Sequence, residues 1–182
     1  YIDVRVSFKL VLHPENGNRP MTADNHPINE LDLQAMLDAA NDSLMAAYGR
    51  GYRFVLAEPP VEIGWPCTSC PSTNPSFWYG VTFSGAPTLL DFENTAKGNT
   101  AAFAWRTNAI NLYINQGKGN GGVSSFPPND IVVFGATVVD PNFRAAFPGA
   151  LLHHELGHYF DLKHTFDSQP GCTDTTVASC SS

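Results

Sequence analysis

The stretch His153–Phe166 reads HHELGHYFDLKHTF and contains the pattern H-E-x-x-H at His154, Glu155 and His158. Residues four apart on an α-helix project from the same face, so the two histidines can direct ring nitrogens at one metal ion. Glu155 follows the first histidine and lies beside the same site without being needed as a ligand. The stretch therefore predicts a helix that carries two zinc ligands and a carboxylate.

A third histidine, His164, follows six residues after His158. Six residues of continued helix would carry it roughly 9 Å along the axis, whereas a zinc–nitrogen bond is about 2 Å long. The helix must therefore end, and the chain turn back, near Asp161. Three neutral histidines leave a fourth position for water, as in a catalytic zinc site. The alternative is an ordinary amphipathic helix whose solvated histidines fall at ligand spacing by coincidence.

These residues resemble the metzincin zinc signature H-E-x-x-H-x-x-G-x-x-H, with Asp161 in the place of its glycine. Glycine accepts a positive φ freely, and Asp tolerates it better than most other residues, so the turn is feasible here. Within the metzincins, HELGHYFDLKHTF and the nearby Gly171-Cys172 are most similar to the pappalysin (cytophagalysin) family of secreted metalloendopeptidases.

The resemblance implies an α+β fold like the N-terminal subdomain of a metzincin. Its twisted, mixed and mainly parallel sheet would have a backing helix and an active-site helix. The implied activity is hydrolysis of internal peptide bonds of a protein or peptide substrate. His154, His158 and His164 would bind Zn²⁺, and Glu155 would act as general base on a zinc-bound water.

The family's methionine-containing turn, which follows the third histidine, has no counterpart after His164, because Met21, Met36 and Met45 all lie early in the chain. We therefore expect residues 1–182 to form a single catalytic domain that lacks most of the C-terminal subdomain, with a missing C-terminal segment or a pro-segment as additional partners. The alternative function is an inactive or incomplete zinc-binding fragment that serves as a binding or assembly module. A non-peptide amidase is a third candidate.

Composition places the chain among globular domains, with 43% hydrophobic residues and a net charge of −7. An acidic chain argues against nucleic acid or an anionic membrane as partner. No apolar run is long enough for a membrane helix, and no signal peptide is visible, so we expect a processed, secreted protein. The cysteines predict disulfides between Cys67 and Cys70 and between Cys172 and Cys180, although other pairings are open. Asp167 and Asp174 make Ca²⁺ a second candidate cofactor.

Hydrophobic periodicity predicts the other elements. Residues 2–12 alternate as a half-buried strand, and residues 29–48 have the period of a helix capped by Asn29. Further strands are expected at residues 52–57, 109–115, 123–126 and 131–134, the last of these buried on both faces. His13 and His26 read as solvated loop residues.

Residues 58–108 are rich in Pro, Gly, Ser, Thr and Asn and predict a long loop, with a strand only at 77–83. The WPCTSC segment within it favours a structural disulfide over a redox site, because prolines bracket the cysteine pair. Residues 117–122 match the dinucleotide fingerprint G-x-G-x-x-G, but VSSFPPND follows and cannot form the required helix. We expect these glycines to form a bend before an edge strand that pairs with substrate, as the resemblance implies.

The catalytic helix is expected to begin near Pro148, with Leu156 and Phe160 anchoring it to the core. His153 points about 100° away from His154 on a helix, so it reads as a surface or supporting group and not as a ligand.

Overall fold

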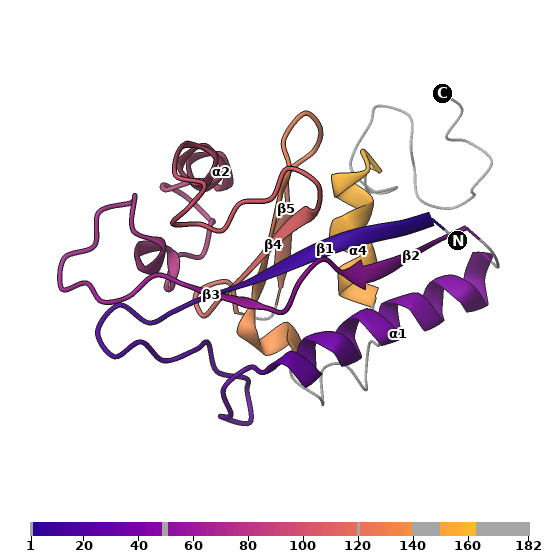
Figure 1. Ribbon diagram of the computed structural model, residues 1–182, viewed down its shortest axis with the longest axis horizontal. Coiled ribbons are helices and arrows are strands. Elements are labelled where there is room, and N and C mark those ends of the chain that lie inside the picture. The colour runs from indigo at the N-terminus through magenta and orange to yellow at the C-terminus, as the bar shows by residue number, and fades with distance from the viewer. Residues whose placement is uncertain (1, 49–50, 120, 140–149, 163–182) are drawn as a thin grey trace.

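The computed structural model describes residues 2–48, 51–119, 121–139 and 150–162 (Figure 1). They form a mixed α+β domain in which helices cover both faces of one sheet, which confirms the predicted fold class. Within this part of the chain, no helix is long and apolar enough to cross a membrane.

The sheet has the strand order β2-β1-β4-β6-β5, and β3 pairs with the second half of β1 beside β2. All pairings are parallel except that of β5 with β6. The strands are β1 (Ile2–Val11), β2 (Tyr52–Leu56), β3 (Val61–Ile63), β4 (Ile110–Asn115), β5 (Gly122–Ser124) and β6 (Ile131–Gly135). β3 is a strand that the sequence did not predict, whereas strands do form in the ranges expected at residues 2–12, 52–57, 109–115, 123–126 and 131–134.

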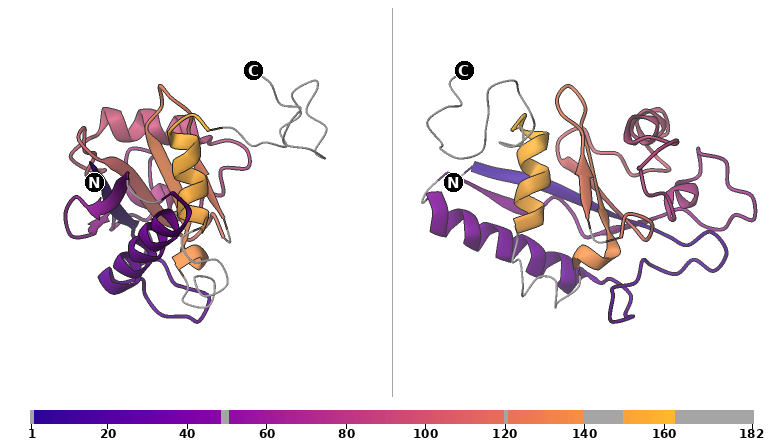
Figure 2. Two further views of the ribbon diagram at one scale, coloured as in Figure 1. Left: turned by 90° about the vertical axis from the view of Figure 1, so that its right-hand side faces the viewer. Right: turned by 180° about the vertical axis from the view of Figure 1, so that it is seen from behind.

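Among the described helices, α1 (Glu30–Tyr48) and α4 (Ala150–Tyr159) pack on one face of the sheet and α2 (Leu89–Gly98) lies on the other face (Figures 1 and 2). The first face carries α1 and α4, whose apolar stripes join the sheet in one hydrophobic cluster. The second face carries α2 and a cluster built on aromatic residues. The β4 and β6 strands lie in the middle of this sandwich and are buried along their whole length.

Residues 58–108 do not form the long loop that their composition predicts. Besides β3 and α2 they contain a 3-10 helix, Pro75–Trp78, which replaces the strand expected at 77–83. Thr88 begins α2 with a capping box to Asp91, a local signal that the prediction missed. Trp78 and Phe92 stack with ring centroids 4.6 Å apart on the sheet, so tertiary packing organises this weakly periodic segment.

This covering layer also corrects the prediction of a half-buried β1. From Val6 to Val11 the strand is buried on both faces, because residues 58–108 fold over its polar side. As a result, Lys9 is buried and 0% exposed. Its ammonium group donates to the Asn111 side chain at 2.6 Å and to the Ser7 carbonyl at 3.1 Å. Burial lowers the pKa of Lys9 to about 7, although the carboxylate of Glu58 acts in the opposite direction.

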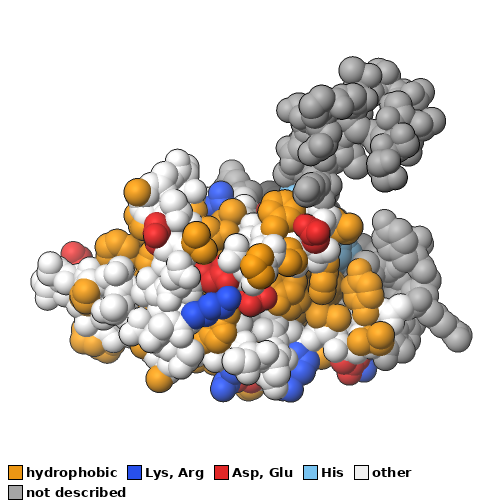
Figure 3. All heavy atoms as spheres, turned by 90° about the horizontal axis from the view of Figure 1, so that it is seen from above, with side chains coloured by type: hydrophobic (Ala, Val, Ile, Leu, Met, Phe, Trp, Pro, Cys, Tyr) orange, Lys and Arg blue, Asp and Glu red, His pale blue; other side chains and the backbone are white. Residues whose placement is uncertain are grey.

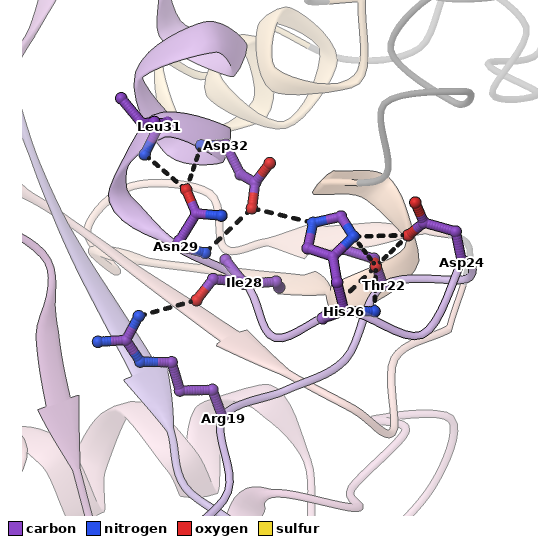
Figure 4. Close-up of polar contacts among 8 residues, drawn as sticks. All are labelled: Arg19, Thr22, Asp24, His26, Ile28, Asn29, Leu31 and Asp32. Atoms are coloured by element: carbon purple, nitrogen blue, oxygen red, sulfur yellow. Dashed lines mark hydrogen bonds and ion pairs between the residues drawn. The ribbon is translucent and has the colours of Figure 1, made fainter.

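The N-terminus of α1 is held by a polar network that includes His26 (Figure 4). Asn29 accepts hydrogen bonds from the Leu31 and Asp32 amides, as its predicted capping role requires. The His26 ring lies 2.8 Å from Asp24 through Nδ1 and 3.2 Å from Asp32 through Nε2. Burial alone would lower the pKa of His26, but these two carboxylates outweigh it and raise that pKa. His26 lies in a loop as predicted, with its side chain 33% exposed, but the sequence did not predict these two contacts.

Lys9 makes the stability of the fold depend on pH. Between pH 7 and 10.5 the unfolded chain binds a proton on this lysine that the folded chain releases, so the free energy of unfolding rises with pH in that window. The slope from one such group is at most about 1.4 kcal/mol per pH unit. We expect urea unfolding at pH 7.5 and 9.5 to show greater stability at the higher pH for the natural chain.

Lys9→Met should abolish most of this difference, because it removes the titrating group while the Asn111 oxygen keeps its hydrogen bond from the Arg106 amide. Equal pH dependence in both proteins would contradict the assignment to Lys9.

Candidate functional site

Helix α4 presents its apolar side to the core, and His154 and His158 lie on another side of the helix. Leu152 and Leu156 are buried in the cluster shared with α1 and the sheet, which confirms the anchoring role of Leu156. Phe160 does not share that role: it follows the last helical residue, is 47% exposed and lies with its ring 6.4 Å from that of Tyr52. The predicted start of α4 near Pro148 lies outside the described residues.

The helix ends in a left-handed turn at Asp161, as the spacing of the histidines predicted. Asp161 has φ 68°, its amide donates to the His158 carbonyl at 2.9 Å, and the Leu162 amide donates to the Gly157 carbonyl at 2.9 Å. These two hydrogen bonds are those of a Schellman motif, which usually places glycine at this position. Asp161 therefore performs the conformational role of the glycine in the metzincin pattern.

The two described histidines of the motif face one another. The Nε2 atoms of His154 and His158 are 3.2 Å apart, and the rings meet at 78°. Two nitrogens bound tetrahedrally at the usual zinc distance lie about 3.3 Å apart, so the pair has the spacing of zinc ligands. His164 lies outside the described residues, within which no cluster of three metal-binding side chains occurs.

The turn at Asp161 also determines the tautomer of His158. Its Nδ1 lies 2.7 Å from the carbonyl oxygen of Leu162, and a carbonyl can only accept a hydrogen bond. The Nδ1 atom must therefore carry the proton, which leaves the lone pair of Nε2 directed toward His154. Metal-bound histidines in proteins almost always make such a hydrogen bond through the second ring nitrogen. The residues present therefore fit a zinc ion.

Glu155 lies where α4 meets the edge strand β5. It is 5% exposed, its backbone carbonyl accepts a hydrogen bond from the Ser124 hydroxyl at 2.7 Å, and its side chain runs close to Gly122. The sequence predicted Glu155 as a functional residue but gave no indication that these two residues contact it. The sequence signal for these contacts was indirect: Gly122 is a glycine beside the strand expected at residues 123–126.

The β5 strand borders the histidines and has one unpaired edge. Among the described residues it pairs only with β6, in antiparallel register, and ends the sheet as predicted. Just beyond it, Phe126 is 38% exposed and its ring centroid lies 5.1 Å from that of His158. Figure 3 shows hydrophobic side chains gathered on this face of the molecule, close to histidine atoms. An extended chain placed along β5 would therefore find free backbone groups and an apolar side chain near the histidine pair.

His153 is directed away from this site. Its ring lies 6.2 Å from that of Phe54 in β2, and its Nε2 is buried without a hydrogen-bond partner among the described residues. Burial lowers the pKa of His153, and a hydrogen bond with the Ala40 backbone opposes this effect. It is therefore not a surface group, and its placement agrees with its exclusion from the ligands.

The glycines of residues 117–122 form a bend, in agreement with the rejection of nucleotide binding. A Cβ atom on Gly117 would lie 2.2 Å from the backbone of Gly80, and one on Gly135 would lie 2.0 Å from that of Gly119. These glycines allow backbone segments to approach closely and thereby fix the start of β5.

Cys67 and Cys70 form the predicted disulfide. The other predicted pair, Cys172 with Cys180, and the calcium candidates Asp167 and Asp174 lie outside the described residues.

Comparison with known proteins supports the family assignment. The model of the peptidase M43 family, described as Pregnancy-associated plasma protein-A, matches residues 94–181, which include β4, β5, β6 and α4. Over residues 94–181 this chain matches a pappalysin-family metzincin. The match supports a metallopeptidase that acts on proteins or peptides. No curated protein and no solved structure matches the chain.

The turn at Asp161 provides a test of this pappalysin site. Asp161→Gly should stabilise the protein by about 1 kcal/mol or less, because glycine adopts a positive φ without the cost that Asp bears. Asp161→Val should destabilise the turn and weaken zinc binding, because a β-branched residue strongly disfavours this conformation. Thermal unfolding and competition with a zinc chelator would measure both effects. Equal zinc affinity in both variants would contradict a role of the turn in holding His158.

Proposed function

We propose that this pappalysin-family protein is a secreted, zinc-dependent endopeptidase. The observation that carries the proposal is the orientation of the two helix histidines, whose Nε2 atoms lie 3.2 Å apart while the Leu162 carbonyl holds Nδ1 of His158. His154, His158 and His164 would hold the ion. Bound zinc would supply an electrophile that polarises a peptide carbonyl and makes water more acidic.

Glu155 would move the protons of the reaction. As a carboxylate it accepts a proton from the attacking water and then donates that proton to the amine that leaves when the peptide bond breaks. Its position one residue after His154, on a helix anchored by Leu156, would bring the carboxylate to the side of the histidine pair without making it a ligand.

The substrate would bind as an extended chain along the unpaired edge of β5. Backbone hydrogen bonds to an edge strand give affinity without demanding a particular sequence, which suits cleavage of internal peptide bonds in many proteins. The disulfide Cys67–Cys70 supports an oxidising, extracellular environment.

Glu155→Gln tests the proposed base. We expect this variant to keep its fold and about one zinc per chain, as a nearly isosteric change outside the ligand set should, and to lose casein hydrolysis by at least about 100-fold. The natural protein should cleave casein, and a chelator should abolish that cleavage. The measurements are metal content, thermal unfolding and release of peptides.

His158→Ala is the companion variant, because it should lose both zinc and activity. Casein cleavage by Glu155→Gln at the natural rate would exclude Glu155 as the base. Zinc binding without cleavage by the natural chain would instead favour the binding or assembly module.

A further inference from the structure

We propose that Gly122 and Ser124 of β5 are positioning residues that set the place of Glu155 relative to a substrate bound along that strand. The inference rests on the proposed function, and it assigns to the edge strand a second role besides pairing with substrate. Neither residue needs to touch the reacting atoms, because each acts on Glu155.

The first contact is one that only glycine permits. A Cβ atom on Gly122 would lie 2.6 Å from Cγ of Glu155 and 2.6 Å from the ring of Phe134, closer than a Cβ atom approaches atoms to which it is not bonded. Gly122 and Phe134 are paired across β5 and β6, so the strand and the ring form one surface. The Glu155 side chain lies directly against this surface, which is why it is only 5% exposed.

The second contact comes from the same face of the strand. Residues two apart in a strand point to the same side, so Ser124 faces α4 together with Gly122. Its hydroxyl donates to the backbone carbonyl of Glu155 at 2.7 Å, and the side chain is buried. One contact therefore fixes the backbone of Glu155, and the other limits where its side chain can go.

The start of β5 is itself held in place. The Gly135 amide donates to the Gly121 carbonyl at 3.0 Å, and the backbones of Gly119 and Gly135 are in close contact. These contacts therefore fix the position of β5 relative to α4. A substrate that pairs with the free edge of β5 is placed by the same strand that places the carboxylate of Glu155, so the scissile bond and the base are positioned together. Misplacement of a catalytic group by about 1 Å can lower a rate about 100-fold, so this shared reference should affect turnover.

The chain offers a matched control for each residue. Gly121 adjoins Gly122, but a Cβ atom on it would meet only the end of the Lys118 side chain, at 4.0 Å. Ser125 adjoins Ser124, but its hydroxyl contacts the backbone of Ile131 within the β5–β6 hairpin and not α4. Substitution of the control residues therefore makes the same chemical change immediately beside β5 without altering the contact to Glu155.

The experiment compares Gly122→Ala with Gly121→Ala, and Ser124→Ala with Ser125→Ala, in the zinc-loaded protein. We expect Gly122→Ala to lower kcat for a peptide substrate by about 10- to 100-fold, and Ser124→Ala by about 3- to 10-fold, with KM within about twofold of the natural value. Both controls should stay near the natural kcat. Ser124→Thr, which keeps the hydroxyl group, should recover most of the activity lost in Ser124→Ala.

A second readout does not depend on activity. In metal-free protein, amide hydrogen exchange in residues 150–159 should be faster in Gly122→Ala and Ser124→Ala than in their controls, because α4 loses a contact to β5. A rise in KM with unchanged kcat would overturn the proposal, since the two residues would then bind substrate. Equal losses in the controls would also overturn it, because they would indicate general disruption of β5. If the natural protein cleaves no peptide, the proposed function fails first, and the exchange data alone decide whether the contacts hold α4.

Discussion

The hydrogen bond between Nδ1 of His158 and the Leu162 carbonyl depends on a change of backbone direction that few residues allow. Helix α4 could continue past Tyr159 only by carrying the following residues away from the histidine pair. The left-handed conformation of Asp161 ends the helix, satisfies the carbonyls of Gly157 and His158, and turns Leu162 back toward the ring. One conformation thus fixes the end of the helix and the tautomer of His158.

The two-sided burial of the sheet gives this turn a rigid support. The β4 and β6 strands are covered on one side by α1 and α4 and on the other by the aromatic cluster around Trp78 and Phe92. Parallel strands buried on both faces are mostly hydrophobic, and β6 is an example. The histidine pair lies beside the edge strand β5, where the sheet still offers unpaired backbone groups.

The sequence predicted most of the first face and little of the second. Strand alternation, the Asn29 cap and the H-E-x-x-H spacing are local signals, so α1, α4 and the turn at Asp161 could be read directly. Residues 58–108 carry no comparable period, because their order comes from aromatic contacts with a sheet that a single sequence does not display. The burial of Lys9 and the contacts of His26 could not be predicted for a similar reason. Lys9 contacts Asn111, which is far away in the sequence, and the contacts of His26 depend on the path of a loop that periodicity does not determine.

The glycines show why a motif must be read together with its backbone. G-x-G-x-x-G in residues 117–122 matches a nucleotide fingerprint by letters, but the structure explains its glycines in another way. Gly117 lies against Gly80, Gly122 lies against Glu155 and Phe134, and Gly119 has a positive φ of 65°. In a dinucleotide site the absent side chains make room for pyrophosphate at a helix N-terminus. Here Gly117 and Gly122 make room for other parts of the same chain, and Gly122 makes room for Glu155, the residue that follows the first histidine of the catalytic motif.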